Sequence, residues 1–104
     1  MSQYALYIMQ RAQQWLDKEL PSIAEDVMKS LNELCRNPKG MGKVVRNPAL
    51  WRPNLGQPYR FAIYKHYESL GGLRVIYYVV DEPYNRVIVY KIGTHADDVY
   101  ENGN

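Results

Sequence analysis

The side chains best suited to acid–base chemistry in this sequence are its two histidines, His66 and His95. An imidazole titrates near neutral pH, so it can both donate and accept a proton under physiological conditions. Arg74 adds a guanidinium, whose planar donors match the oxygens of a phosphate group. Two histidines and a single cysteine, widely separated, do not form a metal-ligand cluster. These residues are therefore candidates for acid–base chemistry on a negatively charged substrate.

Positive charge is concentrated in the middle of the chain. Between Arg36 and Tyr67 there are seven basic residues and no acidic residue. Such segregation is the electrostatic footprint of a polyanion partner, although a solvated basic loop would also produce it. The residues from this stretch that we expect to bind substrate are Lys43, Arg46, Arg52, Arg60 and Lys65.

A chain of 104 residues is long enough for one modest core, so we expect a single domain over residues 1–104. No apolar run approaches the roughly 20 residues that span a membrane. The N-terminus lacks the basic segment and apolar block of a secretory signal. Cys35 is the only cysteine, which favours a reducing compartment and a plain core thiol. We therefore expect a cytoplasmic protein that does not bind membranes.

Two helices are predicted in the first third of the chain. Apolar residues from Ala5 to Leu16 recur at helical spacing, although the alternation over Gln3–Ile8 also fits an opening strand. Pro21 then breaks the chain, and Ser22–Glu25 is a capping-box sequence that starts a second helix. Asn37–Gly40 ends that helix. Because the joint is short, the two helices should form an antiparallel hairpin.

The second half of the chain is predicted to be a loop followed by strands. Residues 39–58 are rich in glycine and proline and favour a loop. Strands are expected over Tyr59–Tyr67, Leu73–Val80 and Arg86–Ile92, joined by short turns as an antiparallel meander. We therefore predict an α+β fold, with an N-terminal two-helix hairpin packed on an antiparallel sheet of three to four strands. The other face of the sheet would then be free for polar residues.

Alternation along the strands predicts which candidate side chains share a face. Arg60 and His66 fall on one face of the first strand, and Lys65 falls on the other. Arg74 opens the middle strand, and His95 follows the third. We expect His95 to face Arg74 across the free side of the sheet, with Arg60 and His66 beside them.

Two segments resemble a known family of toxins. The run Gly72-Leu73-Arg74-Val75-Ile76-Tyr77 is similar to the Gly-x-Tyr-Arg-aliphatic-aliphatic-Tyr strand of the RelE/ParE toxin superfamily, with Leu73 in place of tyrosine. The run Ile92-Gly93-Thr94-His95-Ala96-Asp97, followed by Val99-Tyr100, resembles the Gly-Thr-His-x-Asp-Leu-Phe ending of the YafQ-like RelE branch, with Asp98 as an additional residue. The order of the predicted helices and strands extends the resemblance over nearly the whole chain.

The resemblance implies the toxin of a type II toxin–antitoxin system. Such a toxin would be a ribosome-dependent endoribonuclease, or mRNA interferase, and a cognate antitoxin would neutralise it. The 2′-OH of the RNA attacks the adjacent phosphate and leaves a 2′,3′-cyclic phosphate. This reaction needs a base, an acid and cations beside the phosphoryl oxygens, with no metal or other cofactor. An acidic or amphipathic antitoxin segment is expected to cover the site.

The same resemblance implies roles for individual residues. Arg74 would bind phosphate oxygens, His95 would act as the acid, and Tyr100 would stack on or orient the substrate. His66 and Lys65 are both candidates for the base, but they point to opposite faces, so only one of them can serve. His66 is favoured because it shares its face with Arg60.

Three other interpretations stay open. The chain could be a ParE-type inhibitor of DNA gyrase, which would not need His95. It could be an inactive module that retains only antitoxin binding, or a generic RNA-binding domain that uses the basic loop. The last of these explains the segregated charge but not the C-terminal motif.

Overall fold

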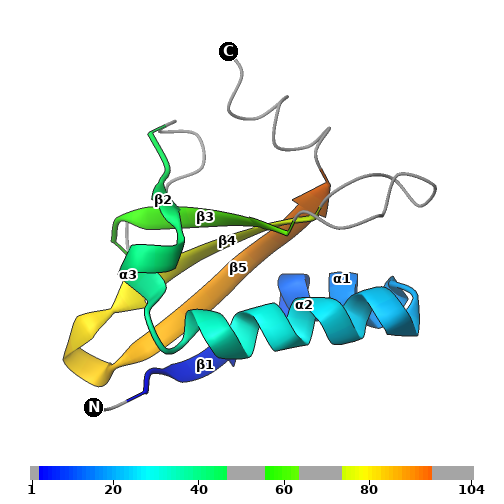
Figure 1. The fold of residues 1–104 in the computed structure, drawn as a ribbon, viewed down its shortest axis with the longest axis horizontal. Helices are drawn as coiled ribbons and strands as arrows, with labels where there is room; N and C mark the ends of the chain where they lie inside the picture. Colours follow the sequence, from blue (N-terminus) through cyan, green and yellow to red (C-terminus); the bar gives the residue numbers. More distant parts are fainter. Residues whose placement is uncertain (1–2, 47–55, 64–73, 95–104) are drawn as a thin grey trace.

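The computed structural model describes residues 3–46, 56–63 and 74–94. In chain order these residues form β1 (Ala5–Ile8), α1 (Gln10–Lys18), α2 (Pro21–Leu34), α3 (Pro38–Met41), β2 (Lys43–Val44), β3 (Pro58–Ile63), β4 (Arg74–Asp81), the 3-10 turn η3 (Glu82–Tyr84) and β5 (Arg86–Thr94). The sheet forms one layer, and α1 and α2 lie together on one side of it (Figure 1). The predicted α+β class is confirmed. Within the described ranges, no helix is long and apolar enough to cross a membrane.

The opening segment is a strand as far as Ile8, so the alternation over Gln3–Ile8 was the correct signal. β1 forms one edge of the sheet and pairs in parallel with β5. Leu6 and Ile8 pack against the core under the helices, whereas Tyr7 is 52% exposed. The first helix therefore begins only at Gln10, and it buries Ala12 and Leu16.

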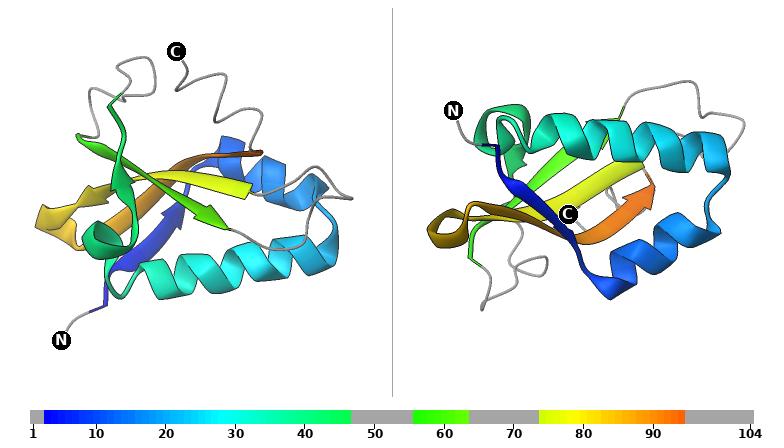
Figure 2. Two further views of the ribbon diagram at one scale, coloured as in Figure 1. Left: turned by 45° about the horizontal axis from the view of Figure 1, so that its top comes forward. Right: turned by 90° about the horizontal axis from the view of Figure 1, so that it is seen from below.

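The predicted helical hairpin is confirmed. Only Glu19 and Leu20 separate α1 from α2, and the chain reverses direction between them (Figure 2). The predicted start of α2 was wrong, because Pro21 is its first residue and Leu20 is its N-cap, with no side-chain cap bond. Proline suits that first position because its missing N–H would have no helical partner there. The buried face of α2 consists of Ile23, Val27, Leu31 and Leu34.

The segment predicted as a loop over residues 39–58 contains regular structure at its start. The short helix α3 has Pro38 as its first residue, and the two-residue strand β2 follows it. β2 pairs antiparallel with β3, Lys43 opposite Arg60 and Val44 opposite Tyr59.

The sheet has the order β1-β5-β4-β3-β2. Its centre is the predicted antiparallel meander of β3, β4 and β5. The parallel β1 and the short β2 add an edge on each side, which makes the sheet five-stranded and mixed where we predicted three or four antiparallel strands. Neither edge strand is easy to predict from the sequence. Both strands are short, and β1 lies far from its partner β5 along the chain.

Side chains are buried on both faces of the sheet. On the helix face, Ile76, Tyr78 and Val89 pack with α1 and α2. On the opposite face, here called the open face because neither α1 nor α2 covers it, a second cluster contains Val75, Tyr77, Val79, Ile88 and Tyr90, each at most 5% exposed. The expectation that this face would be free for polar residues was therefore wrong for the centre of the sheet.

Candidate functional site

A row of polar and aromatic side chains crosses the open face at right angles to the strands. Its members are Lys43 on β2, Arg60 on β3, Tyr77 on β4 and Lys91 on β5. Each is the registered partner of the next, so they occupy directly opposite positions on neighbouring strands. Because opposite residues point to the same face, the row places Arg60 and Lys91 on either side of Tyr77, with Lys43 beyond Arg60.

A bulge in β5 brings Lys91 into this row. Tyr77 pairs with Lys91, but the next residue, Tyr78, pairs with Val89, so Tyr90 is an extra residue in β5. Tyr90 belongs to the open-face cluster, whereas Val89 and Ile92 belong to the helix-face core. Tyr90 and Lys91 therefore share the open face opposite Tyr77. This change of side chain direction is a common consequence of a β-bulge.

Tyr77 supports Lys91 from below. The Nζ of Lys91 lies 5.8 Å from the centroid of the Tyr77 ring, in cation–π geometry. The Tyr77 ring also stacks on Tyr90, with 6.3 Å between the ring centroids. Tyr77 is only 1% exposed. The Tyr77 ring therefore packs against the lysine and is not exposed for a ligand to stack on.

The other end of the row depends on a buried hydroxyl group. Tyr78 donates a hydrogen bond of 2.6 Å to the carbonyl oxygen of Pro38, and it is completely buried. Burial, with a smaller contribution from Tyr59, raises the pKa of this phenol well above its ordinary value. A Cβ on Gly42 would lie 2.0 Å from the Tyr78 Oη, so only glycine fits at this position. This close contact fixes the backbone between α3 and β2, directly before Lys43.

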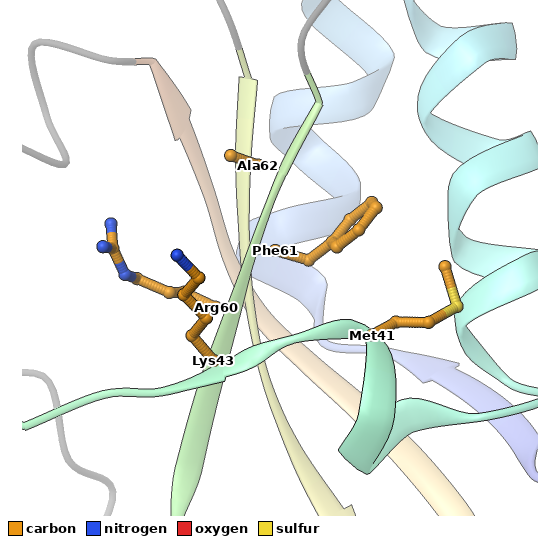
Figure 3. Close-up of a pocket in the computed structure, with 5 residues that line it drawn as sticks. All are labelled: Met41, Lys43, Arg60, Phe61 and Ala62. Carbon is orange, nitrogen blue, oxygen red and sulfur yellow. The ribbon is translucent and has the colours of Figure 1, made fainter.

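A small cavity of about 160 Å³ lies where β2 meets β3. Lys43, Arg60 and Ala62 line it together with Met41 and Phe61. In Figure 3 the side chains of Lys43 and Arg60 extend to one side of β3, and those of Met41 and Phe61 extend to the other. The cavity therefore lies at the β2–β3 edge of the sheet, with the two cationic side chains on the open face and the apolar ones on the helix face.

The acidic residues of the described ranges lie away from this row. They are Asp17, Glu19, Glu25, Asp26 and Glu33 on or beside the two long helices, and Asp81 and Glu82 at the connection between β4 and β5. Asp81 pairs with Arg86 there, at 2.6 Å, and Glu82 pairs with Lys39. No described acidic residue occupies a register position in the row.

Arg74 lies on the opposite face of the sheet from Arg60. Arg60 is opposite Tyr77, and Arg74 is three residues from Tyr77 along β4, so the two arginines point to different faces. The Nε of Arg74 lies 3.1 Å from Glu19 Oε2, and its guanidinium lies 5.8 Å from the Trp15 ring centroid. The side chain is only 3% exposed. The expectation that Arg74 and Arg60 share one face was wrong.

The remaining predicted residues divide between exposed and undescribed positions. Arg46 is exposed and follows the end of β2, outside the row. The other predicted site residues, His66, His95, Tyr100, Lys65 and Arg52, lie outside the described residues. Within the part that the structure describes, two of the predicted substrate-binding residues come together, Lys43 and Arg60.

Sequence reasoning missed Lys91. Strict alternation through β5 would place Lys91 on the same face as Val87 and Val89, against the helices. A lysine in that position would be buried without an obvious partner, and this conflict was the available signal for a bulge.

No family model matches the chain, and no curated protein sequence matches it. Solved structures do match it. The toxin–antitoxin complex RelBE2 from Mycobacterium tuberculosis is 20% identical, with a TM-score of 0.71, covering 93% of this chain and 97% of that chain. A mutant of the E. coli toxin RelE in the free state is 22% identical, with a TM-score of 0.63, covering 97% and 94%.

A RelE mutant from E. coli bound to a peptide of the antitoxin RelB is 23% identical, with a TM-score of 0.63, covering 99% of this chain and 96% of that chain. Each of these likenesses extends over nearly the full length of both chains. At this level of sequence identity, these likenesses establish the fold of the chain and not its chemical activity. The chain therefore has the fold of the RelE toxins.

Proposed function

We propose that this chain is the toxin of a toxin–antitoxin pair and that it cleaves mRNA on the ribosome. One observation carries the proposal most directly. A chain with the RelE toxin fold presents a row of cations on its open face, away from the described acidic residues. A phosphodiester backbone is the polyanion that this arrangement fits best.

In the proposed reaction, the 2′-OH of the substrate RNA attacks the neighbouring phosphorus and the 5′-oxygen of the next nucleotide leaves. His66 removes the proton from the 2′-OH, with Lys65 as the alternative base, and His95 protonates the departing oxygen. The products are a 2′,3′-cyclic phosphate and a free 5′-OH. Tyr100 holds the substrate in position. The reaction written in this way uses no metal ion.

Phosphate binding in this proposal begins with Arg60 and Lys43, which already lie side by side on the open face. Arg52 and Arg46 extend the basic surface along the chain. Arg74 differs from these residues, because its Nε donates a hydrogen bond to Glu19 on the helix face. It can contact a substrate phosphate only after that ion pair opens.

The proposed protein partner is a cognate antitoxin. The similar M. tuberculosis structure is a toxin–antitoxin complex, and one E. coli RelE structure holds an antitoxin peptide. A segment with acidic residues would compete with RNA for Lys43 and Arg60 on charge grounds. Competition for one surface is the simplest way for a bound protein to silence the toxin.

The test is primer extension on a translated mRNA, with and without the purified protein. We expect cuts that appear only when ribosomes translate the message. The His95→Ala variant should cleave at least about a hundredfold more slowly, the loss expected for a missing general acid. Lys29→Gln, on the exposed side of α2, serves as the matched control and should cleave like the wild type. Altered plasmid supercoiling without RNA cuts would indicate a gyrase inhibitor and refute the proposal.

A further inference from the structure

We propose that Lys91 is a phosphate-binding residue of this surface, and that it forms with Arg60 and Lys43 a track for single-stranded RNA running across the strands from β2 to β5. The inference rests on the proposed function and adds a residue and a direction to it. Neither the C-terminal motif nor the basic central stretch includes Lys91.

The first argument is the bulge. A regular β5 would direct Lys91 into the helix-face core beside Val87 and Val89. The extra residue Tyr90 turns Lys91 to the open face, and Ile92 still returns to the core. The local distortion therefore has one clear consequence, which is to present a lysine beside Tyr77.

The second argument is the way the lysine is held. The Tyr77 ring lies 5.8 Å below its Nζ and is itself fixed by Tyr90. An aromatic face attracts an ammonium group. The contact restricts the conformational freedom of Lys91, which lowers the entropic cost of binding an anion.

The third argument is spacing. Neighbouring strands lie roughly 5 Å apart, so Arg60 and Lys91 are separated by about 10 Å across β4, and Lys43 lies about 5 Å further out. Phosphates follow one another at roughly 3.4 Å along the axis of a stacked strand. The row thus spans about four nucleotides, and it requires the RNA to cross the strands rather than run along them.

The experiment measures binding separately from cleavage. A short fluorescent RNA with 2′-O-methyl groups throughout cannot undergo 2′-OH attack, so anisotropy titrations report affinity alone. Titrations of wild type, Lys91→Gln, Lys91→Arg and the control Lys29→Gln are repeated over a range of salt concentrations. Circular dichroism of each variant verifies that the fold is retained.

If Lys91 binds phosphate, Lys91→Gln lowers the slope of log affinity against log salt by roughly 0.7, the value for one contact to a single strand. Lys91→Arg keeps the wild-type slope because it keeps the charge, and Lys29→Gln keeps it because α2 lies on the other side of the sheet. A Lys91→Gln slope equal to that of the wild type would overturn the inference, as would a wild type that binds this RNA without salt dependence.

The two proposals can fail separately. If the wild type cuts translated mRNA while Lys91→Gln retains full RNA affinity, only the role of Lys91 is refuted. If Lys91→Gln loses affinity but the wild type makes no cuts on the ribosome, the cleavage proposal is refuted and the binding track stands. Loss of affinity for an antitoxin peptide alone, with RNA binding intact, would assign Lys91 to the protein interface and overturn the inference.

Discussion

An arginine on the helix face of the sheet has different surroundings from an arginine on the open face. On the helix face, Arg74 is 3% exposed on its side chain, is bound to Glu19 and lies against Trp15. On the open face, Arg60 is only partly buried and lies between Lys43 and Tyr77 in the cross-strand row. These arginines belong to neighbouring strands, yet one joins the sheet to α1 and the other lines a basic surface.

The comparison shows that strand register, rather than residue type, assigns these cations their roles. A charge that points toward the helices must find a partner, because burial without one is very costly. A charge that keeps contact with water, as that of the partly buried Arg60 does, carries less of this cost. The faces should therefore respond differently to substitution, with changes in stability on one face and changes in binding on the other.

The largest expected effect is on the helix face. Arg74→Ala leaves the Glu19 carboxylate, whose side chain is 15% exposed, without its partner. We expect a loss of about 2–3 kcal/mol in the free energy of unfolding, below the roughly 3–5 kcal/mol for breaking a fully buried pair because Glu19 keeps some contact with water. Urea unfolding measures this loss. Arg60→Ala, the matched change on the open face, should cost less than Arg74→Ala because Arg60 is only partly buried.

A double change sharpens this first prediction. Removing both charges, as in Glu19→Gln with Arg74→Met, should cost less than Arg74→Ala alone, since no unpaired carboxylate is left. Equal losses for Arg74→Ala and Arg60→Ala would contradict the distinction between the faces.

The second prediction concerns Gly42, which lies between α3 and β2 and against the Tyr78 hydroxyl. Gly42→Ala would place a methyl group 2.0 Å from the Tyr78 hydroxyl, on the residue before Lys43. We expect a loss of about 2 kcal/mol by urea unfolding, as for other overpacked sites. RNA affinity should fall as well, because a backbone shift at Gly42 would also move the adjacent Lys43. In a Tyr78→Phe background the same alanine should cost less; an undiminished cost there would show that the hydroxyl is not the source of the clash.

The smallest expected effect lies outside both faces. Glu82 accepts a hydrogen bond of 2.9 Å from Tyr4 and pairs with Lys39, and these two contacts join the residue before β1, α3 and the turn after β4. Lys39 first, and Tyr4 second, lower the pKa of the Glu82 carboxyl. The contribution of Glu82 to stability is therefore present above the unfolded-state pKa of about 4.3 and is lost as the pH falls through the lower folded-state value.

Glu82→Gln tests this sign. The variant should be slightly less stable than the wild type at about pH 7, and the two unfolding midpoints should converge as the pH falls below the folded-state pKa of Glu82. High salt should also reduce the difference at neutral pH, because the contacts are exposed. A difference that stays constant across the pH range would mean that the charge of Glu82 contributes nothing.

Much of the fold could be predicted from local pattern. The 3.6-residue spacing located α2, although not its first residue, and β-favouring runs located β4 and β5 to within one or two residues at each end. Alternation also holds within β3, since Arg60 and Ala62 lie on one face and Phe61 and Ile63 on the other. Period-two alternation is a local property of an extended chain, so it survives in any sheet that the strand joins.

The sequence by itself determined the α+β class, the hairpin and meander, and the concentration of basic residues that includes Lys43 and Arg60. Only the tertiary structure decided that Arg74 pairs with Glu19, a residue 55 positions away, and that the bulge at Tyr90 brings Lys91 to the open face. The physical reason is that register and partner choice depend on contacts between distant segments. Residue type and spacing limit these contacts, but only the assembled sheet selects among them.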